Sequence, residues 1–171
     1  AKQRGRDTHH FFDPHHDRLL QARHEQRQRF MDALDHDELR LHYQPQVDMR
    51  SGQVVGVEAL IRWQHPERGL LSPGQFLPAI DATPLEIDLG EWVIEQALRQ
   101  HESLVLMKVY GRFPRIKALL AKNGLLDAAL MMSEATLPGE QCWRHLRDVS
   151  DDQPLPYFST ILVNKQWEYA E

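Results

Sequence analysis

Apolar residues recur at helical spacing over residues 17–34, with a heavily charged opposite face. This pattern is typical of a solvent-exposed helix and predicts a linker helix there. Two runs rich in strand-forming residues follow, Leu39–Val47 and Val54–Trp63, and Ser51-Gly52 between them supplies turn chemistry. We therefore expect a β-hairpin, or two successive strands.

The next segment predicts two helices. Prolines and glycines between residues 65 and 76 favour a loop, and Ser72 is a good helix N-cap with Gln75 three residues later. Pro73 at the first helical position then predicts a short helix over residues 73–80. A second helix is expected after Pro84. One of its faces would hold Leu89, Trp92, Val93, Gln96 and Ala97.

Near His101 the pattern changes. We expect a mixed sheet with helices, because strand-like apolar runs alternate with helical spacing from here on. Pro114 and Gly124 mark the start and the end of one helix. The elements expected in order are a buried strand at 103–111, a helix at 113–124, a strand at 125–136, a short helix at 139–149 and a last strand at 157–164.

Composition narrows the class of protein. The net charge is -5 with ten histidines counted as neutral, which gives no basic patch for a nucleic-acid polymer. Cys142 is the only cysteine, so no internal disulfide forms, and we expect a small buried or half-buried residue. No apolar run approaches the roughly 20 residues that cross a bilayer. We expect a cytoplasmic product without membrane association, cut from a larger parent.

A histidine-rich tract precedes the linker helix. His9, His10, His15 and His16 fall on either side of an Asp13-Pro14 turn. Such a tract predicts at most weak, adventitious binding of nickel or zinc.

Glu58 is the residue best suited to a chemical role, such as binding a cation. Side chains alternate along a strand, so Glu58 and Arg62 share one face, whereas the aliphatic opposite face is expected to pack on a helix layer. A carboxylate facing an enclosed space needs a cation or a hydrogen-bond donor, and Mg²⁺ is one candidate because it prefers oxygen ligands. Alternatively, Glu58 and Arg62 pair with each other or lie in solvent at an edge.

Three ordered segments carry a resemblance to a known family. YQPQVD, GVEALIRWQHPERGLLSPGQFLPAI and LGEWVIEQAL resemble the opening of the EAL family of cyclic-di-GMP phosphodiesterases, over residues 28–100. Glu58-Ala59-Leu60 is the signature tripeptide. The resemblance implies a TIM-type barrel in which two divalent ions, Mg²⁺ by expectation, activate water. It also implies that Glu58 is a metal ligand and that Gln44 and Arg62 contact cyclic-di-GMP.

The neighbouring residues extend this resemblance but do not complete it. Residues 1–16 resemble the last strand of a GGDEF diguanylate-cyclase domain, and 17–34 the linker helix that follows one. The family's later Asn, Glu, Asp-Asp, Lys and Glu motifs have no counterpart. A barrel needs roughly 200 residues or more, and residues 35–102 supply about two of its eight strands.

A second resemblance covers residues 103–171. Met107-Lys108, the turn at 124–127, Pro138-Gly139-Glu140 and PYFS at 156–159 resemble the C-terminal part of the precorrin-2 and cobalt-factor II methyltransferases. This resemblance implies S-adenosylmethionine as the cofactor. The Gly-rich loop of that family is missing upstream of residue 103, so a surface position for Lys108 and a core position for Tyr157 are favoured over a binding role.

The sequence thus predicts an α/β chain that joins an incomplete TIM-barrel-like EAL piece to a small mixed α/β piece like the C-terminal domain of tetrapyrrole methylases. Both enzyme sites lack parts. Three hypotheses follow: retained EAL-type binding or hydrolysis, a precorrin methyltransferase fragment, or a non-enzymatic oligomeric fragment. The third is the expected physical state, with self-association through exposed strand edges.

Overall fold

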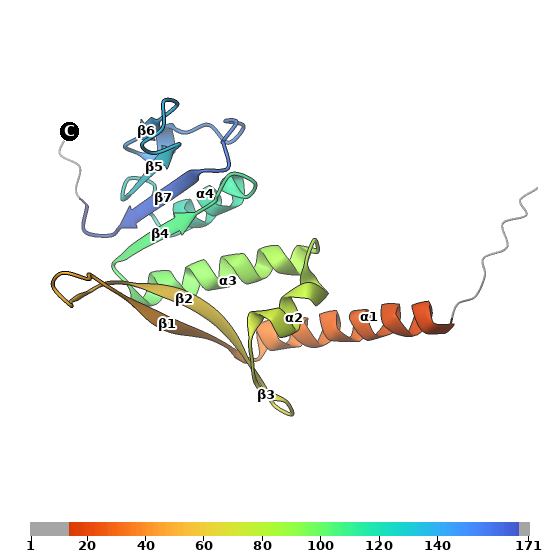
Figure 1. Cartoon of the computed structure of the whole chain (residues 1–171). Coiled ribbons are helices and arrows are strands. Elements are labelled where there is room, and N and C mark those ends of the chain that lie inside the picture. Colours follow the sequence, from red (N-terminus) through yellow and green to blue (C-terminus); the bar gives the residue numbers. More distant parts are fainter. Residues whose placement is uncertain (1–13, 168–171) are drawn as a thin grey trace, which may run out of the picture. The chain divides into compact units, whose positions relative to one another are not determined.

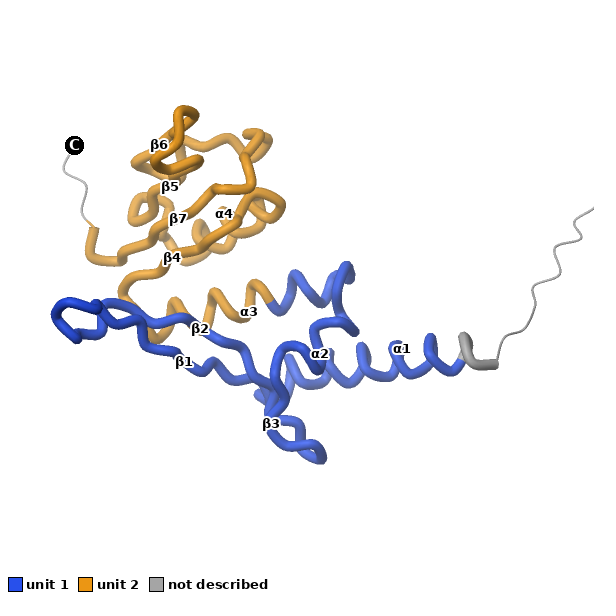
Figure 2. Tube along the Cα trace, viewed as in Figure 1, with its two compact units in different colours: residues 1–89 blue, residues 90–171 orange. Residues whose placement is uncertain are grey.

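The computed structural model describes residues 14–167, with side chains from residue 18 onward. The GGDEF-like tail and the histidine tract therefore lie outside the side chains that it describes. The chain divides into two compact units, residues 1–89 and 90–171 (Figure 2).

The first unit contains a long helix followed by a hairpin and a short helix (Figure 1). Its three strands form an antiparallel sheet in the order β1-β2-β3. The helix over residues 17–34, the hairpin and the helix after Ser72 are confirmed. The elements are α1 (Pro14–Asp35), β1 (Leu39–Val47), β2 (Val54–His65), β3 (Gly69–Leu71) and α2 (Pro73–Ile80).

The strand β3 was expected to be part of a loop, and that prediction is wrong. Gly69 adopts a positive φ of 71° and turns the chain back, so that Gly69–Leu71 pairs with Trp63–His65. Helix α2 then begins as its sequence predicts. The Gln75 side chain accepts a hydrogen bond from the Ser72 N–H at 2.8 Å, which is one half of a capping box.

The core of the first unit lies at the base of the hairpin. Phe30 of α1 is 5.4 Å from the Trp63 ring and 5.5 Å from the Phe76 ring of α2, centroid to centroid. All three side chains are buried. Toward the hairpin tip the expected helix layer is not found, since Val55 and Val57 are 70% and 42% exposed. The prediction of an aliphatic face packed on helices is therefore correct only near Trp63.

The second unit is a four-stranded sheet with helices on one face. Its order is β4-β7-β5-β6, and every pairing is antiparallel, so the expected mixed sheet is wrong. Helix α3 begins in the first unit and continues into the second. The elements are α3 (Pro84–Gln100), β4 (Ser103–Met107), α4 (Phe113–Lys122), β5 (Ala129–Ser133), β6 (Gln141–Trp143), the 3₁₀ helix η1 (Leu146–Asp148) and β7 (Ser159–Asn164).

Two local predictions in this unit fail. The expected helix at 139–149 is instead β6 and η1, because Gln141–Trp143 pairs with the edge of β5. Short isolated helices are marginal, and an available sheet edge satisfies the same backbone groups. The strand at 103–111 ends at Met107, and Val105 and Met107 are exposed because they alternate with Leu104 and Leu106, which pack against the core on the other face. Cys142 is exposed rather than buried.

Alternate residues of the strands form the second core. Ala129, Met131, Ile161 and Val163 point to one face and are buried. Helix α4 contributes Phe113 and Leu120, and α3 contributes Leu98. The other buried members are Val109, Leu146 and Val149.

The whole is a mixed α/β partial structure. Within residues 14–167 the strands form two open sheets and no closed barrel. None of the described helices has the length and apolar character that a membrane span requires.

Candidate functional site

The register of the hairpin brings two of the three predicted site residues together. Gln44 of β1 lies directly opposite Glu58 of β2. Side chains opposite each other in an antiparallel pair leave the sheet on the same face, with Cβ atoms roughly 5 Å apart. Arg62 lies on this face too, opposite Arg40 and two alternate positions along β2 from Glu58.

These side chains are open to solvent rather than enclosed. Gln44 and Glu58 are exposed and Arg62 is half-buried. The Arg62 guanidinium donates through Nη1 to the carbonyl of Ile61, at 2.8 Å. Among the described residues no ion pair joins Arg62 to Glu58. Glu58 is thus open to solvent and Arg62 half-buried, and the two do not pair with each other within the described structure.

The donor set does not fit a two-metal site. Mg²⁺ takes oxygen ligands in octahedral geometry, and two-metal hydrolysis holds a pair of ions about 4 Å apart. Glu58 is the one carboxylate on the polar face of the described hairpin. Nowhere in the part of the chain that the structure describes do three or more His, Cys, Asp or Glu side chains gather as a metal cluster. We therefore derive no hydrolytic step through Mg²⁺.

An ionic cluster that the sequence did not reveal fixes the base of the hairpin. Arg29 of α1 donates through Nη2 to both carboxylate oxygens of Glu38, at 2.7 and 2.6 Å. The Trp63 indole N–H donates to Glu38 Oε2 at 2.9 Å, and the Arg29 guanidinium lies 5.5 Å from the Trp63 ring centroid. No spacing rule links residues 29, 38 and 63, because only the fold brings helix and strand together.

This cluster controls the ionisation of Glu38. Burial by itself raises the pKa of the carboxyl group, but hydrogen bonds from Arg29 and Trp63, with the charges of Arg29 and His65, outweigh it. The net result is a pKa below the usual value of 4.5. Glu38 is therefore a structural anion that positions β2, and with it Glu58 and Arg62.

The second unit carries an exposed aromatic cluster where β4 ends and β7 begins. The Tyr157 ring centroid lies 5.3 Å from that of Tyr110 and 5.3 Å from that of Phe158. Lys108 Nζ lies 5.3 Å from the Tyr157 ring centroid. A hydrogen bond with Tyr157, and its charge, raise the pKa of Lys108. Lys108 is a surface residue as expected, but Tyr157 is 46% exposed on its whole residue and is not a core residue.

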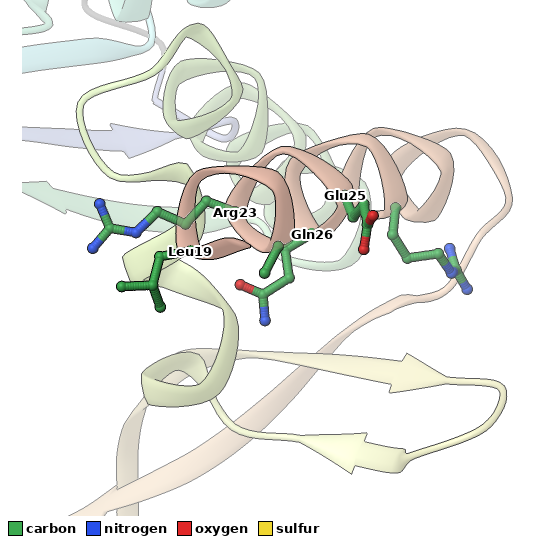
Figure 3. Close-up of a pocket in the computed structure, with 6 residues that line it drawn as sticks. Leu19, Arg23, Glu25 and Gln26 are labelled. Carbon is green, nitrogen blue, oxygen red and sulfur yellow. The ribbon is translucent and has the colours of Figure 1, made fainter. Parts of the chain in front are cut away.

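The surface also has an open depression along α1, shown in Figure 3. Leu19, Arg23, Gln26 and Arg29 line it together with Ala22 and Glu25. All six residues belong to one helix, and none of them is a predicted site residue.

The model of the EAL domain matches residues 27–163, and the chain belongs to the EAL domain family. This match crosses the segment that resembles a methylase.

Two curated relatives of this chain are named as different kinds of enzyme. The chain is 73% identical over 97 residues to "Cobalt-precorrin-2 C(20)-methyltransferase" of Salmonella typhimurium (strain LT2), covering 57% of this chain and 39% of the relative. It is 45% identical over 104 residues to "Bifunctional diguanylate cyclase/cyclic di-GMP phosphodiesterase MucR" of Pseudomonas aeruginosa, covering 58% of this chain and 15% of the relative. The chain thus spans well under half the length of either.

Two solved structures are also similar to part of this chain. "PaMucR Phosphodiesterase, c-di-GMP complex" is 36% identical with a TM-score of 0.41, covering 57% of this chain and 34% of that one. "Structure of EAL Enzyme Bd1971 - cAMP and cyclic-di-GMP bound form" is 28% identical with a TM-score of 0.46, covering 62% and 25%.

Proposed function

We propose that this chain joins the start of a cyclic-di-GMP phosphodiesterase domain to a segment derived from a precorrin methyltransferase, and that the chain alone does not hydrolyse cyclic-di-GMP. The observation that carries the proposal is the single carboxylate, Glu58, on the polar face of the described hairpin. In-line attack on a phosphodiester by a two-metal mechanism needs ions on both the attacking and the leaving oxygen. One ligand cannot hold two such ions.

The residual role of the hairpin is weak recognition of the dinucleotide. We assign Gln44 and Arg62 to contacts with the nucleotide and Glu58 to one Mg²⁺. A guanidinium is suited to a phosphate group because its N–H groups match the phosphate oxygens. The shared face of these three residues supports the assignment. Their exposure makes the binding weak, because charged contacts in water contribute little.

Hydrolysis and binding are tested on the 171-residue chain. Cyclic-di-GMP with Mg²⁺ is incubated with stoichiometric protein, and linear product is measured by chromatography. We expect none. Binding is measured by thermal shift with Ca²⁺ or Mg²⁺, and we expect at most a small shift that Glu58→Ala abolishes. Turnover that is lost in Glu58→Ala would overturn the proposal.

The precorrin methyltransferase is the second candidate function. The observation that favours it is the 73% identity over 97 residues, which is the highest identity among the relatives described above. Under this hypothesis residues 103–171 contribute to a site for S-adenosylmethionine, and Lys108, Tyr110 and Tyr157 form an exposed group in the second unit that a ligand could contact.

Calorimetric titration with S-adenosylhomocysteine separates the two candidates. If the methyltransferase function is retained, the titration gives a saturable heat that Lys108→Ala and Tyr157→Ala reduce, while Glu58→Ala leaves it unchanged. No heat with S-adenosylhomocysteine and no shift with cyclic-di-GMP would leave the third hypothesis, a non-enzymatic fragment that retains neither ligand.

A further inference from the structure

A histidine side chain closes the turn between β2 and β3. Nδ1 of His65, the last residue of β2, accepts hydrogen bonds from the backbone N–H groups of Glu67 and Arg68, at 3.2 and 3.3 Å. Among the described residues no backbone carbonyl accepts from these two N–H groups. The imidazole therefore supplies the hydrogen bonds that hold residues 66–68 in the turn.

These contacts fix the protonation state of His65. A backbone N–H group only donates, so Nδ1 must carry a lone pair and the ring proton must lie on Nε2. A protonated imidazole donates from both nitrogens and accepts at neither. Uptake of a proton at Nδ1 and the closed turn therefore exclude each other.

The surroundings of the ring decide which part moves when the proton arrives. His65 is 8% exposed, and its ring lies 5.0 Å from that of Trp63, centroid to centroid. Trp63 is itself held by Glu38 and packs against Phe30. In contrast, residues 66–68 are exposed. The turn can therefore move into water at less cost than the packed ring.

The charged groups around His65 favour the proton without holding the turn closed. The charges of Glu38 and His65 interact, and Arg29 of α1 neutralises part of the Glu38 charge. Helix α2 carries no charged residue, and Glu67 and Arg68 of the turn are exposed to water. Glu38 and His65 both lie outside the turn, so their attraction is the same whether the turn is open or closed. This attraction therefore does not oppose the opening.

We propose that the β2–β3 turn is a pH-sensitive latch, closed while His65 is neutral and released when Nδ1 takes up a proton. Histidine is the side chain whose charge ordinarily changes between about pH 5 and 8. Leu71, at the far end of β3, is 3% exposed and keeps that end in the core. The opening is therefore local. It frees the end of the β2 edge at His65, which pairs with Gly69 when the turn is closed.

Nuclear magnetic resonance of the full chain tests the latch. The His65 ring and the amides of Glu67 and Arg68 are followed from about pH 7.5 to about pH 5.5, the range in which histidine titrates. We expect the amide shifts to follow the titration of the ring, and the hydrogen-exchange protection of both amides to fall about fivefold or more. Glu38 stays ionised in this range because its pKa lies below 4.5, so it does not cause the change.

His65→Asn separates the hydrogen bonds of the turn from the titration. The Asn side-chain oxygen accepts hydrogen bonds but does not titrate, so the turn is expected to stay closed at both pH values. His65→Leu has no acceptor, and its turn is expected to be open at both. His42→Asn removes an exposed histidine of β1 and is the control, which is expected to respond to pH like the unmodified chain. Circular dichroism and melting of each variant identify loss of folding.

Equal amide protection at both pH values in the unmodified chain would overturn the proposal. Titration of the His65 ring without any change at Glu67 and Arg68 would do the same, and so would a pH response that persists in folded His65→Asn. The first two outcomes need no variant. Because no ligand is added, the result is independent of whether the chain binds cyclic-di-GMP.

Discussion

At the scale of residues, a half-buried anion holds the helix to the hairpin. Glu38 accepts from Arg29 and from Trp63, and its side chain is 19% exposed. A hydrogen bond to a charged group is worth about 1.5–3 kcal/mol when the unpaired partner stays buried. The surface ion pair of Arg40 with Asp37, at 3.2 Å, contributes far less because water screens both groups.

We predict that Glu38→Gln lowers the free energy of unfolding by about 1.5–3 kcal/mol at pH 7. The amide keeps one acceptor but loses the charge that attracts Arg29. Urea denaturation followed by tryptophan fluorescence measures the change, because Trp63 is part of the cluster. Glu67→Gln, on the exposed turn, is the control and is expected to leave stability unchanged.

We predict that the stability difference between the unmodified chain and Glu38→Gln depends on pH. Because the folded-state pKa of Glu38 is lowered, the carboxylate stabilises the fold fully above its usual pKa of 4.5. That stabilisation is lost as the pH falls through the lower folded-state value. The difference in melting temperature between the unmodified chain and Glu38→Gln is therefore expected to shrink below pH 4.5. A difference that stayed constant down to pH 2 would contradict the role of the charge.

At the scale of elements, three aromatic rings join α1, β2 and α2. Phe30 is 1% exposed and packs edge-on against Trp63 and nearly parallel to Phe76. Removing a buried aromatic ring costs the transfer free energy and leaves a cavity. No comparable contact was found for Met31, the next residue of α1, which is 44% exposed.

We predict that Phe30→Ala destabilises the first unit by about 3–5 kcal/mol. Met31→Ala is the matched variant in the same helix turn and is expected to change stability by about 0.5 kcal/mol or less. Chemical denaturation of both variants measures the difference. Similar losses for the two variants would mean that α1 does not hold the hairpin through this ring.

At the scale of the whole molecule, the two units have separate cores. The aromatic cluster of the first unit lies within residues 1–89, and the large apolar cluster of the second lies within 90–171. Only α3 is continuous through both units. Compact regions with their own cores often open as separate cooperative units.

We predict two transitions in differential scanning calorimetry. Phe30→Ala is expected to lower one of them and Leu120→Ala, at a fully buried position of α4, the other. Each variant leaves the core of the other unit intact. A single transition that both variants move by the same amount would show that α3 couples the units into one.

Much of the local structure follows from sequence. The periodicity of residues 17–34, the hairpin turn, and Ser72 with Gln75 each predict an element that the structure contains. The helix expected at 139–149 fails because its residues suit either state, and the edge of β5 selects the strand. The roles predicted for Gln44, Glu58 and Arg62 stay predictions, although the register places all three on one face.

Sequence by itself determined the EAL family, the order of most elements and the position of Glu58 on a strand, because these depend on side-chain pattern and on short specific segments. Tertiary structure alone decided the pairing of Gln44 with Glu58, the ionic cluster around Glu38 and the free edge of β2. Each of these depends on which segments meet across a distance in sequence, and no local pattern records that.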